Sequence, residues 1–201
     1  YVWHYQTTPG ESWDYNSAMD MVLVTLPIDG ERRKLLLHAP KNGFFYVLDR
    51  ATGKLVSAEK IVKVTWAEKI DLATGRPVEA PNARYQSGET HIWPNNQGAH
   101  SWHPMAYSPD TGLTYIPVRE MAGYYSDKGV DLKNWRHPEG LNFSTGLSAV
   151  DHMGNVPADA ATSALLAWDP LRQRESWRVP TPGAFGGGIM TSAGNLVFQG
   201  D

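Results

Sequence analysis

Short apolar runs separated by Gly, Pro, Asp and Asn dominate the hydrophobic pattern of this chain. No stretch shows the spacing of an amphipathic helix of ordinary length. Apolar runs of this kind, bounded by turn residues, are typical of β-strands. The pattern predicts strands at residues 1–6, 21–27, 34–39, 44–48, 62–66, 105–107, 113–118, 163–168, 176–179, 189–191 and 196–198.

The most informative stretch joins the apolar runs 35–37 and 44–48 through Pro40-Lys41-Asn42-Gly43. Asn-Gly between two apolar runs is the strongest short-range hairpin signal, and it predicts a tight type I′ turn with positive φ at both central residues. Both runs are apolar at consecutive positions, so protein is expected to cover both faces of the hairpin. Lys41 is then a single charge at the tip of a buried hairpin, either held out into water or aimed at an anionic group.

A unit of strand, turn and strand recurs at residues 46–55, 107–118 and 166–179, with a turn that contains D-x-T-G, D-x-x-T-G or Asp-Pro. Repeated short antiparallel strands with Gly and aromatic punctuation favour a β-propeller, with a β-sandwich as the alternative. The polar stretches 77–98 and 119–159 are interpreted as long inserted loops.

A propeller blade takes roughly 40–50 residues, so the chain would supply about three to four four-stranded antiparallel blades. A ring cut at that point would leave an unpaired sheet edge at each end, which natural proteins avoid. Residues 1–201 are therefore interpreted as part of one all-β propeller domain that is incomplete at both ends.

Composition narrows the classes of function. The chain has 18 basic and 21 acidic side chains, a formal charge of −3 and no basic stripe, so nucleic acid is a poor candidate partner. No apolar run approaches the length of a membrane span and no signal peptide is visible at Tyr1, which leaves membrane association open. The absence of Cys excludes disulfides, thiolate zinc sites and cysteine nucleophiles from this stretch.

Four motifs follow one another along the chain. They are YQTTPGESWDY at 5–15, APKNGFFYVLDR at 39–50, GAHSWHPM at 98–105 and TSAGNLVFQG at 191–200. In this order they resemble the motifs of alcohol dehydrogenases that depend on pyrroloquinoline quinone (PQQ), of the quinoprotein and quinohaemoprotein type, and the resemblance covers nearly the whole chain. It implies an eight-bladed propeller with the quinone on its axis beside a bound Ca²⁺ or lanthanide, in a protein exported to the periplasm.

The resemblance assigns roles to two charged residues that would otherwise be read as ordinary turn residues. Asp14 would be the general base that takes the proton from the substrate hydroxyl, and a neighbouring metal cation, of which it is a ligand, would keep it ionised. Lys41 would hydrogen-bond the ortho-quinone oxygens and stabilise the negative charge that develops as the ring accepts hydride.

Four more residues match positions near the quinone, namely Ser101, Trp102, Gly187 and Gly188. Ser101 stands where the family often has Asn and has a shorter reach, while Trp102 either lines the cofactor cavity or packs between blades. The side chain that the family places before its Gly-Gly pair is replaced here, so Gly187 or Gly188 would approach the cofactor through the backbone. As a phosphate loop this Gly-rich stretch is weak, because the GK[ST] ending is missing.

The metal is expected to take several oxygen ligands. The Glu and Asn ligands of the family precede this stretch, so Asp14 is the single ligand expected here, and Asn16 stands where lanthanide-using relatives carry a second Asp, which favours calcium. His100 and His103 have an HxxH spacing without the Glu and third ligand of a zinc site, and packing is the favoured interpretation. Trp13 is expected in the core.

The resemblance implies oxidation of primary alcohols, with aldehydes as further substrates, by hydride transfer to PQQ with the metal as Lewis acid. Electrons would pass to a cytochrome c or to a fused haem domain outside this stretch, which contains no CxxCH. The chain by itself is expected to be inactive. The alternative is a non-catalytic propeller scaffold that binds protein partners, which has no need of Asp14 and Lys41 together.

Overall fold

The computed structural model describes residues 1–128, 130–131, 133–137, 139–140, 161–184 and 186–200, and the regular elements in these ranges are all strands. None of the described segments forms a helix with the length and hydrophobicity that crossing a membrane requires. The strands are β1 (Met21–Ile28), β2 (Glu31–His38), β3 (Phe44–Asp49), β4 (Leu55–Lys60), β5 (Ala67–Asp71), β6 (Arg76–Glu79), β7 (Thr90–Ile92), β8 (Ala106–Ser108), β9 (Leu113–Glu120), β10 (Gly123–Tyr125), β11 (Thr162–Asp169), β12 (Arg174–Thr181), β13 (Ile189–Ser192) and β14 (Leu196–Gln199).

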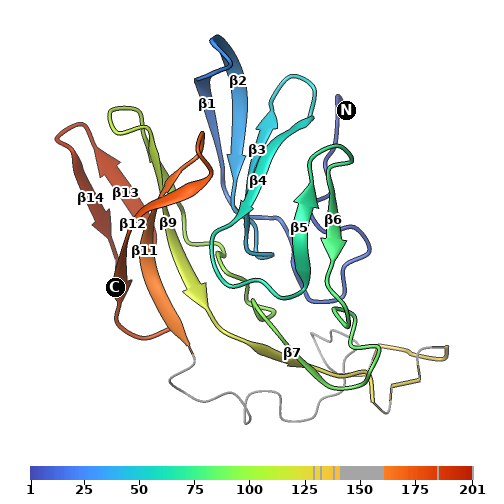
Figure 1. Cartoon of the computed structure of the whole chain (residues 1–201). Coiled ribbons are helices and arrows are strands. Elements are labelled where there is room, and N and C mark those ends of the chain that lie inside the picture. The colour runs from blue at the N-terminus through green and yellow to red at the C-terminus, as the bar shows by residue number, and fades with distance from the viewer. Residues whose placement is uncertain (129, 132, 138, 141–160, 185, 201) are drawn as a thin grey trace.

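Two four-stranded antiparallel sheets form the main body, in the orders β1-β2-β3-β4 and β12-β11-β9-β8. Figure 1 shows them side by side in a fan, with the pair β5–β6 at one end and the pair β13–β14 at the other. β2, β3, β9 and β11 contain long runs of buried residues because neighbouring layers cover both of their faces. The prediction of an all-β fold built from four-stranded antiparallel sheets is confirmed.

The predicted hairpin between β2 and β3 exists, but the predicted type I′ turn is wrong. Residues 39–43 separate the two strands, and of the Asn-Gly pair only Gly43 has a positive φ, of 88°. The buried Asn42 side chain organises this wider loop, since it accepts a hydrogen bond from the Phe44 N–H at 3.1 Å and donates one to the Tyr46 hydroxyl at 2.8 Å. The side chain of Asn42, rather than a two-residue turn, sets the position of Lys41.

The first six residues do not form the predicted strand. The segment instead crosses the tips of the two D-x-x-T-G turns, where Trp3 donates from Nε1 to the Arg50 carbonyl at 3.0 Å and the Tyr5 hydroxyl donates to the Gly75 carbonyl at 2.7 Å. The alternating aromatic residues that suggested a strand are therefore used to cover neighbouring turns, and the backbone has no ladder partner among the described residues.

The predicted strand at 62–66 is also absent. Val62, Val64 and Trp66 are buried, with exposures of 8%, 7% and 0%. The backbone between them is held by single contacts, such as the bond from the Thr65 N–H to the Trp93 carbonyl at 2.9 Å, and not by a sheet ladder. The strand lies earlier, at β4, in a stretch whose mixed polar residues hid it.

The two stretches interpreted as inserted loops contain short strands. Residues 77–98 hold most of β6 and all of β7, and residues 119–159 begin with the end of β9 and β10, which pairs with β7. Residues 129, 132, 138 and 141–159 of the second stretch lie outside the described residues.

Candidate active site

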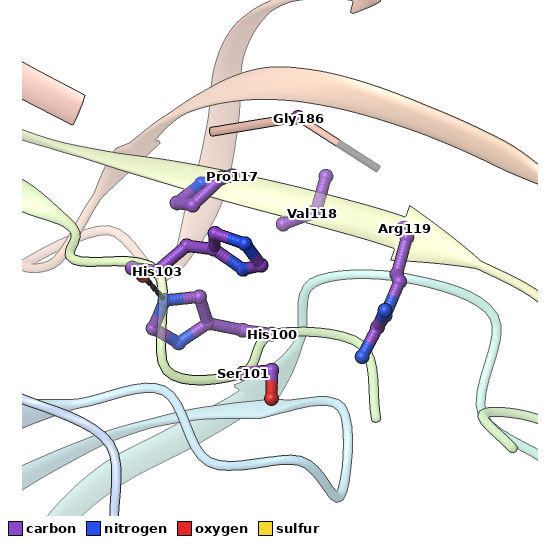
Figure 2. A pocket seen from close by; sticks show the side chains of 7 residues that line it. All are labelled: His100, Ser101, His103, Pro117, Val118, Arg119 and Gly186. Carbon is purple, nitrogen blue, oxygen red and sulfur yellow. Dashed lines mark hydrogen bonds between the residues drawn. The ribbon is translucent and has the colours of Figure 1, made fainter. Parts of the chain in front are cut away.

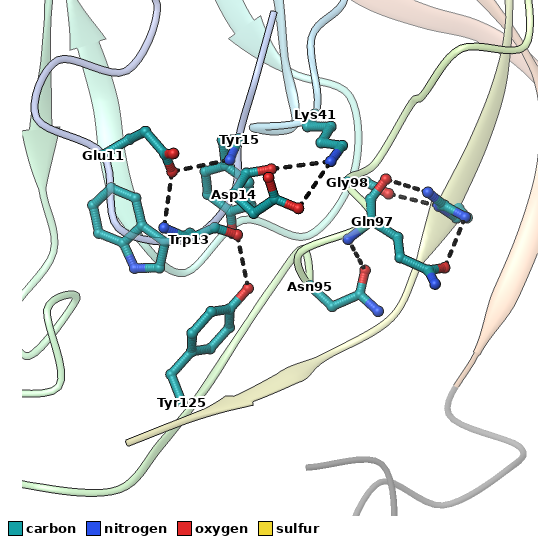
Figure 3. A network of polar contacts seen from close by, with 10 residues as sticks. Glu11, Trp13, Asp14, Tyr15, Lys41, Asn95, Gln97, Gly98 and Tyr125 are labelled. Carbon is teal, nitrogen blue, oxygen red and sulfur yellow. Dashed lines mark hydrogen bonds and ion pairs between the residues drawn. The ribbon is translucent and has the colours of Figure 1, made fainter. Parts of the chain in front are cut away.

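Asp14 and Lys41 contact each other (Figure 3). The Lys41 ammonium donates from Nζ to Asp14 Oδ2 at 3.2 Å and to the Asp14 carbonyl oxygen at 3.1 Å, across 27 residues of chain. The side chains are 13% and 33% exposed, respectively. The structure thus brings the predicted carboxylate and the predicted ammonium together, with the lysine nearly enclosed and the carboxylate open on one side.

The backbone of Asp14 is in the left-handed region, with a φ of 66°. This conformation is unfavourable for a residue with a Cβ and persists only where its surroundings impose it. The neighbours of Asp14 are anchored: Trp13 and Tyr15 are both 1% exposed, Trp13 Nε1 donates to the Ala83 carbonyl at 2.8 Å, and the Tyr15 hydroxyl donates to the Pro94 carbonyl. The prediction that Trp13 belongs to the core is confirmed.

Aromatic rings pack beneath these anchors. The Trp13 and Tyr15 rings stack with centroids 5.6 Å apart, and Trp66 lies against Trp13 at 5.1 Å. The Tyr125 hydroxyl donates to the Trp13 carbonyl at 3.2 Å. Burial raises the pKa of Tyr15 and the pKa of Tyr125, so both phenols remain neutral donors, Tyr15 to the Pro94 carbonyl and Tyr125 to the Trp13 carbonyl.

Glu11 contributes a contact that the residue pattern did not predict. Its Oε2 atom accepts hydrogen bonds from the backbone N–H of Trp13 at 2.8 Å and of Tyr15 at 3.0 Å (Figure 3). Glu11 lies inside the motif at 5–15, which is the one signal in the sequence that could have drawn attention to it.

Residues 95–99 form the support beneath Lys41. The Ala99 N–H donates to the Lys41 carbonyl at 2.9 Å, and Gly98, with a φ of 83°, lies so close that a Cβ there would be 2.6 Å from Lys41 Cα. Arg119 holds this support from below by donating from Nε to the Gly98 carbonyl at 2.7 Å and from a terminal nitrogen to the Gln97 carbonyl. Burial lowers the pKa of Arg119 to about 10, so it is still a cation at neutral pH.

A small, partly open pocket lies next to Arg119. Figure 2 shows the residues that line it, namely His100, Ser101, His103, Pro117, Val118, Arg119 and Gly186. Ser101 lines this pocket, two residues after Ala99, and its predicted contact with a cofactor stays a prediction.

Trp102 is 77% exposed, and its ring stacks on the ring of His103 at a centroid distance of 3.8 Å. It does not pack between the sheets that the structure describes, and both of its predicted roles stay predictions. His100 is 1% exposed, with Nδ1 2.6 Å from the Ala39 carbonyl oxygen and Nε2 2.8 Å from that of His103. The packing interpretation is confirmed for His100, and its burial lowers the pKa of its imidazole. His103 is only half-buried, so packing accounts for it less well.

Gly187 packs against main chain and Gly188 against the ring of Pro104. The Gly187 N–H donates to the Gly200 carbonyl at 2.9 Å, and a Cβ on Gly187 would lie 2.7 Å from that oxygen. A Cβ on Gly188 would lie 2.6 Å from Pro104 Cδ. The main chain at Gly187 and the Pro104 ring at Gly188 leave no room for a Cβ at either position, and the predicted contact of both glycines with a cofactor stays a prediction.

The described residues contain no group of three or more His, Asp or Glu side chains that could hold a metal ion. The carboxylate of Asp14 offers one oxygen to such an ion, because Lys41 engages Oδ2 and no donor among the described residues engages Oδ1. Asn16 is exposed. Asp14 thus fits as one ligand of a hard cation, and the remaining oxygen ligands would have to come from outside the described residues.

Comparison with known proteins agrees with this geometry. The family model for the β-propeller domain of PQQ-containing glucose, ethanol and alcohol dehydrogenases matches residues 1–71. Quinohemoprotein alcohol dehydrogenase ADH IIB of Pseudomonas putida is 53% identical over 199 residues, which are 99% of this chain and 28% of that protein. The solved structure of ADHIIG from Pseudomonas putida HK5 superimposes with a TM-score of 0.86 at 42% identity, covering 99% of this chain and 30% of that one.

A europium-containing methanol dehydrogenase is also similar, with a TM-score of 0.78 at 31% identity over 97% of this chain and 33% of that chain. The chain therefore spans about 30% of the length of these relatives. The two four-stranded sheets correspond to part of a propeller, which excludes the β-sandwich alternative. The chain belongs to the PQQ-dependent alcohol dehydrogenases and corresponds to part of their β-propeller.

Proposed function

We propose that this chain supplies the general base and a quinone-facing ammonium to an enzyme that oxidises primary alcohols, and aldehydes as further substrates, with PQQ as acceptor. The observation that carries the proposal is the contact between Lys41 Nζ and Asp14 Oδ2 at 3.2 Å. The backbone of Asp14, which directs this carboxylate, is in the left-handed region. We further propose that residues 1–201 form part of one propeller domain.

Asp14 takes the proton from the alcohol hydroxyl. Its Oδ1 atom has no donor among the described residues, so this oxygen is open to a substrate hydroxyl or to a cation, while Oδ2 is held by Lys41. The rings of Trp13 and Tyr15 anchor the segment that carries the carboxylate. A base held in this way loses little entropy when the substrate binds.

Lys41 donates to the cofactor. An ammonium has three N–H donors, and the carbonyl and carboxylate of Asp14 take two of them. The third is left for an anionic oxygen, where it stabilises developing negative charge in a site that is largely closed to water. Bound PQQ supplies the two-electron acceptor for the hydride of the alcohol.

The other parts of the proposal rest on resemblance. Ca²⁺ is the proposed cation, with Asp14 as a ligand and Asn16 in place of a second Asp, and Ser101, Trp102, Gly187 and Gly188 are the proposed neighbours of the cofactor. The electron acceptor is a cytochrome c or a haem domain, in keeping with the haem named in the quinohemoprotein relatives. The compartment is the periplasm.

The test uses the intact protein that carries this chain, loaded with PQQ and Ca²⁺, and follows the reduction of an artificial dye by a primary alcohol. Asp14→Ala is expected to lower kcat by about 10³-fold, in the range of general base catalysis, with the absorbance of bound PQQ unchanged. The exposed Asp110, replaced by Ala, is the matched control and keeps wild-type turnover. Unchanged turnover in Asp14→Ala removes Asp14 from the mechanism, and wild-type protein without alcohol-dependent reduction favours the non-catalytic scaffold.

Lys41 is tested separately with Lys41→Met, which keeps most of the stem and removes the charge. Loss of one preorganised donor is expected to lower kcat by about 10²-fold, with Lys54→Met at an exposed turn as the control. If Lys41→Met turns over like wild type, the ammonium has only a structural role beside Asp14.

A further inference from the structure

Glu11 bridges the backbone on the two sides of Asp14. One oxygen, Oε2, accepts from the N–H of the residue before Asp14, at 2.8 Å, and from the N–H of the residue after it, at 3.0 Å (Figure 3). The N–H groups of the two residues that flank Asp14 are thus oriented toward the same atom.

Two N–H groups two residues apart can converge on one anion when the residue between them is in the left-handed region. Such a concave arrangement of backbone N–H groups is a known binding geometry for anions. The left-handed φ of 66° at Asp14 produces the arrangement here, and the Glu11 carboxylate fills it. Charge-assisted hydrogen bonds of this kind are stronger than those between neutral groups.

The other contacts around Asp14 do not replace this one. Trp13 and Tyr15 are anchored through the far ends of their rings, at the carbonyls of Ala83 and Pro94. The Tyr125 hydroxyl holds the Trp13 carbonyl and Lys41 holds the Asp14 carbonyl. None of these contacts engages the N–H of Trp13 or Tyr15, for which Glu11 supplies the acceptor. Rotation of the peptide groups around Asp14 would swing its Cβ and move the carboxylate relative to Lys41.

We infer that Glu11 is a positioning residue for Asp14, which holds the left-handed backbone that aims the carboxylate at its partner. The inference rests on the proposed function of Asp14 as the base. A displacement of about 1 Å at a catalytic group can lower the rate by about 10²-fold. Glu11→Ala is therefore expected to lower kcat by about that factor with little change in KM.

The experiment compares Glu11→Ala, Glu11→Gln and the control Glu31→Ala, an exposed glutamate at the start of β2, in the intact protein. Steady-state kcat and KM are measured after loading with PQQ and Ca²⁺, and the absorbance of the bound PQQ is recorded. Hydrogen–deuterium exchange of the peptide containing residues 11–16 is measured in the protein without PQQ. Gln keeps a carbonyl oxygen that can accept both bonds, so Glu11→Gln is expected to restore kcat and slow exchange, whereas Glu11→Ala exchanges faster.

Three results would overturn the inference. They are an unchanged kcat in Glu11→Ala, unchanged exchange at residues 11–16 in that variant, and a defect in Glu11→Gln as large as that in Glu11→Ala. Equal losses of bound PQQ and of thermal stability in both variants would also assign Glu11 a merely structural role. Wild-type protein that does not oxidise alcohol would instead refute the proposed function, a result that the wild-type assay shows before any variant is compared.

Discussion

Replacement of Gly98 by alanine would put a methyl group where the stem of Lys41 lies. The added Cβ would be 2.5 Å from Lys41 Cβ and 2.6 Å from Lys41 Cα, and it would also meet Lys41 Cγ. The φ of 83° is itself unfavourable for alanine, by about 1–2 kcal/mol. Overpacking of a filled space typically adds about 1–3 kcal/mol, so a total loss of about 2–5 kcal/mol in the free energy of unfolding is expected.

Gly112→Ala is the matched control. Its φ is 71°, close to that of Gly98, but no atom lies within 4 Å of an added Cβ. It is expected to lose only the conformational contribution of about 1–2 kcal/mol. The difference between the two variants in urea unfolding of the intact protein therefore measures the contact with Lys41.

The same comparison has a functional readout. Because the contacted atoms include Lys41 Cα, the clash cannot be relieved by a rotation of the side chain and must displace the loop that carries the ammonium. In the protein loaded with PQQ, Gly98→Ala is expected to lower kcat, while Gly112→Ala is not. Equal losses of stability in the two variants, together with normal turnover in both, would refute the view that residues 95–99 support Lys41.

Asn42→Ala leaves the buried Phe44 N–H without its acceptor and is expected to lower the free energy of unfolding by about 1–3 kcal/mol in urea titrations. Full stability would mean that the loop closes without the side chain. Arg119→Met removes the donors to the carbonyls of residues 97 and 98, so hydrogen–deuterium exchange should accelerate at 95–99, and unchanged exchange there would contradict the support described above. Burial lowers the pKa of His38 below 6.5, so the His38 imidazole binds a proton more readily in the unfolded chain than in the folded protein. The free energy of unfolding is therefore expected to fall as the pH drops below about 6.5, by up to about 1.4 kcal/mol per pH unit. Unfolding midpoints between pH 5 and 7.5 should show this slope in wild type and a shallower one in His38→Gln; identical slopes would contradict the assignment.

The parts of the fold that could be predicted depend on contacts within a few residues. In the D-x-x-T-G turn at 49–53, Asp49 Oδ1 accepts from the Ala51 and Thr52 N–H groups at 3.0 Å each, so the sequence motif contains the whole interaction. The Asp29-Gly30 turn between β1 and β2 has φ values of 52° and 82°, the conformation that these residue types favour. Such local signals located most of the hairpins.

Segments 1–6 and 62–66 show where this reasoning fails. Both have the alternation of a strand, and in both the alternate side chains are used as expected, on turn tips or in the core. A strand also needs a neighbouring backbone at ladder distance, which depends on the path of the rest of the chain. Period-two burial therefore predicted the environment of the side chains but not the hydrogen bonds of the backbone.

The site has the same division between local and distant causes. The hairpin signal indicated that Lys41 would be held rigidly, but its contact with Asp14 spans 27 residues, and the bond from Tyr125 to Trp13 spans 112. No local pattern contains these contacts, which is why the joint role of the two charged residues came from the family resemblance.

The direction of Asp14 nevertheless has a cause in its own neighbours. Trp13 and Tyr15 stack on each other at 5.6 Å and are both buried, so the two rings lie on one side of the chain. The residue between them is thereby turned away from the core, and the acceptor that Glu11 supplies to both flanking N–H groups fixes how far it turns. An aspartate between two core aromatics cannot bury its charge with them, and the left-handed backbone is the conformation in which its carboxylate meets the one ammonium at the hairpin tip.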